Sequence, residues 1–277
     1  FINMKLNKYI LLLNHKILQV RFNLIRKKIL KKKLIWHVCT PKSASTYFMN
    51  YMTNNLNNLY GPINPVSFGG ERDGLQNTCP YSINSQLNML SINKYILTSH
   101  QHAEATYNFF NYVSDKHKII VQTRGILDTI VSLIDHLNKK DSVLKKNHID
   151  KNFMFPHTVR ADIYWENLSE EKKIDFLILN YLPWHLSFLR SWLLRKEENI
   201  FFINYDEVID SPNKVLNNIF LKQNIKEKKN NFEKSKINFN LGIKGRGFKE
   251  INEKQINKIK DTINRLDIMN QNLISYL

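Results

Sequence analysis

Cysteine is scarce in this sequence: Cys39 and Cys79 are the only two among 277 residues. Two thiols cannot build the disulfide framework of a small secreted domain, so a reducing, cytoplasmic location is the expected one. The nine histidines are scattered, and none combines with a cysteine at the spacing of a zinc site. We therefore predict that the protein holds no metal.

Long hydrophobic runs are also absent. In the basic N-terminal segment, residues 1–33, the longest is the run 9–13, whereas a membrane-spanning helix needs about 20 apolar residues. No small-residue cleavage site follows, as a signal peptide would require. The segment fits either a helix on a membrane surface or a helix packed at the edge of the sheet, and its broken apolar face favours packing. Peripheral membrane contact of this segment stays an alternative. The chain starts with Phe1 rather than Met, so the question whether another segment precedes it stays open.

Acidic residues are few, with 24 Asp and Glu against 41 Lys and Arg and a formal net charge of +17. Such a charge attracts phosphate-rich ligands, nucleic acid or an anionic membrane. Lys, Asn and Ile are abundant throughout, a bias that AT-rich coding sequence produces without a partner, so a solvated basic surface is the simpler interpretation. Zinc-finger spacing, aromatic RNA-binding signatures and helix-turn-helix patterns do not stand out, and no specific nucleic-acid partner is expected.

The glycine-rich Walker pattern G-x-x-x-x-G-K-[ST] is missing, which removes the usual signature of ATP binding. A different anion-binding pattern follows the apolar stretch 34–40. A proline ends a predicted strand there, and Ser45 and Thr46 can cap a helix that starts at Tyr47. The helix N-terminus offers free backbone N–H groups and a positive dipole, next to Lys42 and three hydroxyls. We predict a phosphate site at this turn.

A second anion-binding pattern begins where the predicted strand 118–123 ends. Arg124 follows this strand, Ser132 comes eight positions later on a predicted helix, and Asp128 lies between them. The arginine is a planar bidentate donor, and the serine hydroxyl, two helical turns on, can reach the same phosphate. The pattern therefore predicts a second phosphate site.

Four segments in this order resemble the sulfotransferases that use 3′-phosphoadenosine 5′-phosphosulfate (PAPS). The segment 41–47 is similar to their 5′-phosphosulfate loop, P-K-S-G-[ST]-T-W, and the segment 124–132 to their 3′-phosphate motif, R-x-P-x-D-x-x-V-S. The segment 200–212 looks like their strand and turn with a tyrosine and a proline seven positions apart. The segment 242–249 resembles the basic glycine loop that closes over the 3′-phosphate.

The resemblance implies a role for each matching residue. Lys42 would be the catalytic cation that meets the departing bridging oxygen. The donor-binding positions would be Lys42, Ser43, Ala44, Ser45, Thr46 and Tyr47 in the first segment, Arg124 and Ser132 in the second, Tyr205 in the third, and Lys244, Gly245 and Arg246 in the fourth. Tyr47 and Tyr205 would flank the adenine. Ala44 replaces the family's glycine, and a left-handed backbone there would strain the loop. PAPS is thus the implied co-substrate and adenosine 3′,5′-bisphosphate (PAP) the product.

Sulfuryl transfer also needs a base, because the acceptor must lose a proton. The segment 95–104 looks like the family strand that ends at the catalytic histidine. His100 and His102 are both candidates, since residues two apart in an extended chain point to the same side and imidazole titrates near neutral pH. Glu104 is the third, because branches of the family that act on glycans often use glutamate. The sequence leaves these alternatives open.

The order of elements predicts an α/β fold with a central parallel β-sheet flanked by helices, as in the sulfotransferases. Strand patterns near 34–40, 94–99, 118–123 and 200–204 alternate with helical patterns near 46–58, 125–138, 174–196 and 253–266. We expect a basic segment, 1–33, followed by one sulfotransferase domain, 34–277.

The expected function is transfer of the sulfuryl group from PAPS to a hydroxyl or amine of a small molecule, lipid or glycan. The segments 61–92 and 139–170 would shape the acceptor pocket, and their aromatic residues and lysines fit no known template. The alternative is a non-catalytic basic α/β protein that binds phosphate or nucleic acid.

Overall fold

The computed structural model describes residues 33–60, 95–97, 102–110, 113–138, 153–154, 159–160, 165–221, 243–267 and 271–277, with single positions and pairs between 16 and 31. His100 lies outside these residues. In the N-terminal segment, Ile17, Val20 and Leu24 are exposed, so the packed helix favoured for this segment does not bury these three side chains. Among the helices that the structure describes, none combines the length and apolar character needed to cross a bilayer.

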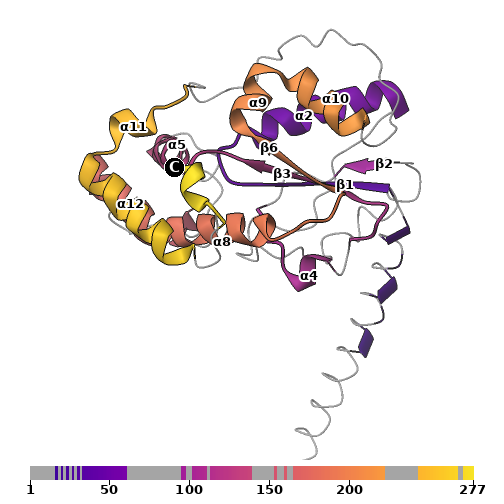
Figure 1. The fold of residues 1–277 in the computed structure, drawn as a ribbon, viewed down its shortest axis with the longest axis horizontal. Coiled ribbons are helices and arrows are strands. Elements are labelled where there is room, and N and C mark those ends of the chain that lie inside the picture. Colours follow the sequence, from indigo (N-terminus) through magenta and orange to yellow (C-terminus); the bar gives the residue numbers. More distant parts are fainter. Residues whose placement is uncertain are drawn as a thin grey trace, which may run out of the picture.

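Four parallel strands form the central sheet in the order β2-β1-β3-β6 (Figure 1). They comprise Tyr95–Leu97 (β2), Lys33–Cys39 (β1), Lys118–Thr123 (β3) and Ile200–Asn204 (β6). The register pairs Trp36 with Ile119 and Val121 with Phe202. β-Branched and aromatic residues dominate these segments and favour extended backbone. The predicted parallel sheet is confirmed.

Helices cover both faces of the sheet (Figure 1). On one face, α2 (Ser45–Tyr60), α9 (Tyr205–Asp210) and α10 (Pro212–Leu221) pack with Ile35 and Ile203. On the other, α5 (Ile126–Asn138), α7 (Glu170–Asn180), α8 (Leu182–Leu193) and α12 (Glu253–Leu266) pack with Trp36 and Val38. Successive side chains of a strand point to opposite faces, so β1 supplies both layers.

The helical stretch predicted near 174–196 is two helices, α7 and α8. Tyr181 is both the C-cap of α7 and the N-cap of α8, and a proline occupies the first turn of α8. Pro183 has no N–H, so a single helix would leave the carbonyl of Leu179 without its donor and bring the proline ring against it. A proline is tolerated in a first turn, where the N–H groups have no intrahelical partner.

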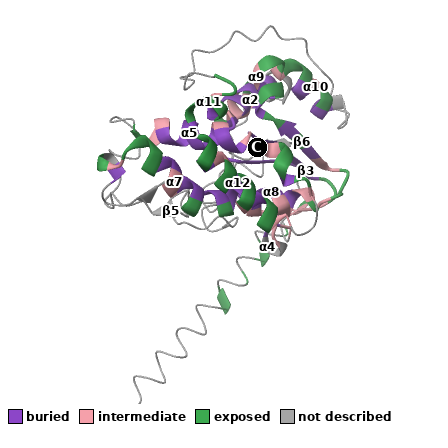
Figure 2. Ribbon diagram, turned by 60° about the vertical axis from the view of Figure 1, so that its left-hand side comes forward, coloured by how far each residue is buried: buried purple, intermediate pink, exposed green. Residues whose placement is uncertain are grey.

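Short elements complete the described chain: α4 (Tyr107–Phe110), the hairpin of β4 (Phe153–Met154) and β5 (Val159–Arg160), η2 (Trp165–Asn167), α11 (Gly247–Glu250) and η3 (Leu273–Tyr276). Figure 2 shows buried residues concentrated in the sheet and on the helix faces turned toward it. Many of the exposed residues lie on the outer helix faces, and others lie in loops and on β6. This is the burial expected of a sheet enclosed between two helical layers.

The topology has a switch point between the ends of β1 and β3. β1 leads into α2 and β3 leads into α5, and the two strands are neighbours, while β2 pairs on the far side of β1. In open α/β sheets, ligands bind where consecutive connections leave the sheet in opposite directions, at the carboxyl ends of the strands. Lys42 and Arg124 follow these two strand ends.

Candidate functional site

The turn between β1 and α2 has an unusual backbone. Lys42 and Ala44 both adopt left-handed conformations, with φ of 60° and 63°. Such a conformation costs a residue with a Cβ about 1–2 kcal/mol, so the strain expected at Ala44 is present. Ser43 Oγ donates a hydrogen bond to the carbonyl oxygen of Thr40 at 2.7 Å, and the Phe48 N–H donates to the carbonyl of Ala44 at 3.0 Å. These bonds close the turn and start α2.

Two side chains from the end of β3 hold successive carbonyls of this turn. Arg124 Nη1 donates to the carbonyl oxygen of Lys42 at 3.0 Å, and the Gln122 amide donates to that of Ser43. A trans peptide places its N–H opposite its C=O, so the N–H groups of Ser43 and Ala44 point away from these donors. Backbone N–H groups gathered in this way form an anion-binding concavity. The end of β3 thus holds the predicted phosphate turn in place, on the side opposite to these N–H groups.

Gln122 is itself fixed by a histidine. Its Oε1 lies 2.8 Å from His37 Nε2, and both side chains are fully buried. An amide oxygen only accepts hydrogen bonds, so His37 carries a proton on Nε2. No sequence motif of the predicted site includes Gln122 or His37, because each has the pattern of an ordinary strand residue. Their role depends on the pairing of β1 with β3.

Arg124 lies at the centre of the site and is 8% exposed. Its guanidinium stacks on the ring of Tyr205, 4.1 Å from the centroid, and Nη2 lies 3.9 Å from Asp128 Oδ2. Burial lowers the pKa of Arg124 from its ordinary value, whereas Tyr205 and Asp128 raise it; the guanidinium stays charged at neutral pH. Its buried Nε has no hydrogen-bond partner within the described part of the chain. A buried cation with an unused donor fits an anionic ligand.

The basic glycine loop lies over the first turn of α5. Asp128 Oδ2 accepts a hydrogen bond from the Gly245 N–H at 2.9 Å, and Oδ1 accepts one from the Gly247 N–H at 2.8 Å. Gly245 has a φ of 70°, which glycine adopts without strain. Arg124 Nη2 reaches the carbonyl oxygen of Ile243 at 3.5 Å. The structure therefore brings together the second and fourth of the predicted segments.

Two cations of this loop, Lys244 and Arg246, are paired with carboxylates. The contacts are Asp210 Oδ2 at 2.6 Å and Asp206 Oδ1 at 3.5 Å for Lys244, and Asp135 Oδ2 at 2.5 Å and Glu250 Oε1 at 2.6 Å for Arg246. A hydrogen bond to Asp210 raises the pKa of Lys244, and one to Asp135 raises the pKa of Arg246. Of the two, Lys244 lines the pocket described next, whereas Arg246 is held toward α5.

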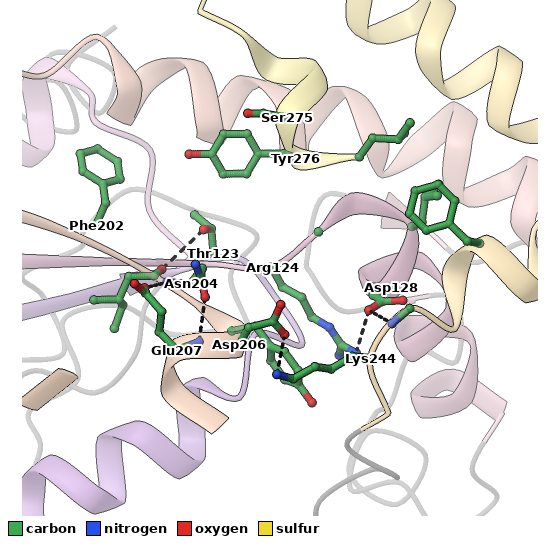
Figure 3. Close-up of a pocket in the computed structure, with 17 residues that line it drawn as sticks. Thr123, Arg124, Asp128, Phe202, Asn204, Asp206, Glu207, Lys244, Ser275 and Tyr276 are labelled. Atoms are coloured by element: carbon green, nitrogen blue, oxygen red, sulfur yellow. Dashed lines mark hydrogen bonds and ion pairs between the residues drawn. The ribbon is translucent and has the colours of Figure 1, made fainter. Parts of the chain in front are cut away.

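A pocket of about 610 Å³ opens beside the carboxyl ends of β3 and β6. Figure 3 shows Arg124, Asp128 and Lys244 toward one side of it and Phe202 and Tyr276 toward the other. The pocket therefore joins charged groups to an aromatic wall. Residues 41–47 are not part of its lining, and the phosphate turn meets it through the bond between Arg124 and the Lys42 carbonyl.

The remaining predicted donor-binding residues lie on the helices that follow the two turns. Ser45 begins α2 and is buried, Thr46 is exposed, and Ser132 is buried two turns into α5. Tyr47 packs in the core layer, with its ring centroid 6.2 Å from that of Tyr51. Tyr47 is 6% exposed and is not part of the lining of the pocket, whereas Tyr205 is. The role of Tyr47 stays a prediction.

Of the two histidine candidates for the base, the structure describes His102. Its Nδ1 lies 2.7 Å from the carbonyl oxygen of Cys39, the last residue of β1, so Nδ1 carries a proton that it donates. In the neutral ring the lone pair is then on Nε2, an atom that is buried in this structure; a base also needs this lone pair to reach the acceptor. Glu104 is half-buried; burial raises the pKa of its carboxyl, and a hydrogen bond with Ser187 lowers it. His100 lies outside the described residues.

The acceptor side is described only in part. The segment 61–92 lies outside the described residues. Trp165, from the segment 139–170, packs in the core, and Lys173 Nζ lies 5.6 Å from the centroid of its ring. Within the described ranges, no group of three or more His, Cys, Asp or Glu side chains could hold a metal ion.

Comparison with known proteins agrees with this geometry. A family model, the sulfotransferase domain, matches residues 34–261. The chain belongs to the sulfotransferase family. The solved structure of mouse sulfotransferase SULT7A1 complexed with PAP has a similar fold, with a TM-score of 0.53, 15% identity and 86% of each chain covered. The predicted sulfotransferase-type fold is thereby confirmed.

Two further solved sulfotransferases are more distant in structure. The sulfotransferase domain from the curacin biosynthetic pathway has a TM-score of 0.42 and 13% identity, over 71% of this chain and 75% of that one. A sulfotransferase from Alicyclobacillus acidocaldarius has a TM-score of 0.41 and 12% identity, over 84% of this chain and 96% of that one. No curated protein matches the chain.

Proposed function

We propose that this sulfotransferase transfers the sulfuryl group of PAPS to a hydroxyl or amine. The observation that carries the proposal is the contact between two anion sites: Arg124, after β3, donates to the Lys42 carbonyl in the turn after β1. A nucleotide with anionic groups on both its 3′ and 5′ oxygens needs two such sites side by side. The similar mouse sulfotransferase was solved with PAP, which supports the same class of donor.

The turn 41–45 would hold the end of the donor that reacts. During transfer the bond between sulfur and the bridging oxygen breaks, and negative charge develops on the departing phosphate. The N–H groups of Ser43 and Ala44 and the ammonium of Lys42 are donors for this charge, and the left-handed backbone sets their direction before the donor binds. Arg124 and Ser132 would hold the 3′-phosphate.

His102 is our choice for the base. The chain runs from β2 past residue 102, and the hydrogen bond to the Cys39 carbonyl keeps the imidazole beside the end of β1, where the phosphate turn begins. Trp192 Nε1 donates to the carbonyl oxygen of Ala103 at 2.9 Å, which ties the next residue to α8. Nε2 would accept the proton of the acceptor as the new bond to sulfur forms. His100 and Glu104 remain the alternatives.

The acceptor is proposed only as a class: a small molecule, lipid or glycan with a nucleophilic hydroxyl or amine. Retention on immobilised PAP tests the donor site. Release by free PAP at constant salt supports the proposal, whereas a non-catalytic polyanion binder would be released by salt alone. Transfer of labelled sulfuryl from PAPS to a panel of phenols, amines and oligosaccharides then tests the reaction. Retention without transfer to any acceptor of these classes would favour a binding protein.

A further inference from the structure

Asp128 is a largely buried carboxylate that has no role in the reaction proposed above. Its side chain is 17% exposed, and each of its oxygens accepts a hydrogen bond from a different glycine of one loop, Gly245 and Gly247. These partners lie more than a hundred residues away in the sequence, so the contact joins two distant segments. Hydrogen bonds from N–H groups to a carboxylate are among the stronger ones in proteins.

The same loop approaches α5 so closely that only glycine fits at one position. A Cβ on Gly247 would lie 2.4 Å from the carbonyl carbon and the Cβ of Leu127, and 2.7 Å from the backbone nitrogen of Asp128. Two of these three atoms are backbone and cannot swing aside. Two contacts with the first turn of α5, the carboxylate of Asp128 and the packing of Gly247, therefore hold the loop, in addition to the ion pairs of Lys244 and Arg246.

This position brings the loop to the group that would hold the 3′-phosphate. Lys244 and Gly245 line the pocket together with Arg124, and Arg124 Nη2 also reaches the Ile243 carbonyl. Asp128 carries a negative charge, so it cannot itself bind a phosphate favourably. Its effect on a 3′-phosphate acts through a neighbour, either the loop that it holds or Arg124, whose Nη2 lies 3.9 Å from Asp128 Oδ2.

We propose that Asp128 is a positioning residue that gives the enzyme its preference for nucleotides with a 3′-phosphate. The inference rests on the proposed function and deepens it. Without the Asp128 carboxylate, the N–H groups of Gly245 and Gly247 lose acceptors, and the loop no longer completes the 3′-phosphate site beside Arg124. The 5′ site, built by the turn after β1, does not contact Asp128 in the described structure.

The test compares two nucleotides that differ only in the 3′-phosphate, PAP and adenosine 5′-monophosphate. Binding of each is measured by calorimetry for the wild type, Asp128→Asn and Gly247→Ala. Asparagine retains one acceptor oxygen and loses the charge, whereas Gly247→Ala displaces the loop without changing any charge. We expect both variants to lose about ten- to a hundredfold of the preference for PAP, with little change for the monophosphate.

Asp175→Asn is the matched control. It removes one negative charge from an ion pair with Lys258, and neither residue lines the pocket; the preference for PAP should be unchanged. Hydrogen exchange of the peptide 243–250 should be faster in Asp128→Asn and in Gly247→Ala than in the wild type. That measurement reports the loop position independently of nucleotide binding.

The outcomes separate the two proposals. If the wild type itself does not prefer PAP over the monophosphate, the proposed donor site is wrong. If the wild type prefers PAP but Asp128→Asn keeps the full preference or strengthens it, the positioning role is wrong and the donor site stands. A loss in Asp128→Asn without a loss in Gly247→Ala would assign the effect to the ion pair between Asp128 and Arg124 and would also overturn the positioning of the loop by Asp128.

Discussion

The guanidinium of Arg124 donates a hydrogen bond to the carbonyl oxygen of Lys42 at 3.0 Å, across 82 residues of sequence. One side chain therefore supports the backbone of the proposed 5′-phosphosulfate turn, and its Nε is an unused donor, within the described residues, for the proposed 3′-phosphate site. The two sites are not independent, because they share this group. Ser132, which belongs to the same motif, has no such contact with the turn among the interactions of the described residues.

Replacing Arg124 by alanine should weaken the binding of PAP by about 2–5 kcal/mol. This is the usual loss when one partner of a buried charge pair is removed. The binding of adenosine 5′-phosphosulfate, which lacks the 3′-phosphate, should weaken by a smaller but measurable amount, because the Lys42 carbonyl loses its hydrogen-bond donor. Ser132→Ala is the matched variant and should affect PAP alone. Calorimetry with both nucleotides checks this. Equal losses for the two nucleotides in Ser132→Ala would remove that serine from the 3′-phosphate site.

Lys42→Ala should reduce the turnover number by about a hundred- to a thousandfold while the protein remains folded. In the proposed mechanism the lost cation would face the charge that develops on the departing phosphate, and such donors contribute about 3–4 kcal/mol to the transition state. Lys116→Ala, an exposed lysine before β3, controls for the change in net charge. Single-turnover rates with labelled PAPS give the measurement, and near-wild-type turnover would exclude Lys42 from the mechanism.

Ala44→Gly should stabilise the protein by up to about 1 kcal/mol. The left-handed backbone costs alanine about 1–2 kcal/mol, and glycine adopts it freely but loses about 0.5–1 kcal/mol through the greater entropy of the unfolded chain. The relief of strain is therefore the larger effect. Ala105→Gly is the control, because Ala105 is not among the residues with positive φ and should only be destabilised. The free energies of unfolding of both variants, measured in urea, test this prediction. If both variants are destabilised equally, the backbone of Ala44 is not strained.

The local parts of the site were predictable from the sequence. A strand that runs into a proline, a lysine and hydroxyls indicates an anion-binding turn, and Arg124 with Ser132 has the spacing of two helical turns. Both patterns lie within a few residues of a strand end. Physical rules about turns and helix termini act over the same short range, which is why these segments could be located.

The contacts between the segments were not predictable in the same way. Gln122 supports the Ser43 carbonyl, and Asp128 holds Gly245, only because β1 pairs with β3 and the C-terminal loop folds back on α5. No local pattern encodes such pairings. The break between α7 and α8 is different, because Pro183 in the sequence indicates a helix start. The apolar pattern continues on both sides of this proline, and one long helical stretch was therefore predicted.

His185 should make the protein less stable in acid. It is fully buried beside the Tyr181 hydroxyl, 2.8 Å from Nδ1, and burial lowers its pKa from 6.5 to about 3. Below pH 6.5 the unfolded chain binds a proton that the folded protein excludes. The stabilisation is therefore complete above pH 6.5 and is lost progressively toward pH 3, by up to about 5 kcal/mol at roughly 1.4 kcal/mol per pKa unit.

Urea unfolding between pH 3 and 7 tests this with two variants. Tyr181→Phe removes the hydroxyl and keeps the imidazole, so the pH dependence should persist. The double variant Tyr181→Phe, His185→Phe removes the titrating group as well, and its stability should change much less over the same range. If the free energy of unfolding depends on pH as steeply in the double variant as in Tyr181→Phe, groups other than His185 cause the acid sensitivity.

The choice between His102 and its neighbours can be made from the pH dependence of the rate. His102→Gln should reduce turnover by about a hundred- to ten-thousandfold, the usual contribution of a general base. PAP affinity should stay unchanged, because the histidine acts on the proton of the acceptor. Glutamine can still donate to the Cys39 carbonyl in place of Nδ1, so the segment should stay in position. The acidic limb of the rate profile, where protonation disables the base, should disappear.

His100→Gln and Glu104→Gln are the matched variants, since each replaces another candidate by a neutral side chain. If His102 is the base, both should retain the acidic limb and most of the rate. Burial raises the pKa of Glu104, so a glutamate base would also give an acidic limb, and the limb alone does not distinguish the two. Its loss in Glu104→Gln, with retention in His102→Gln, would transfer the role to the carboxylate and overturn our assignment.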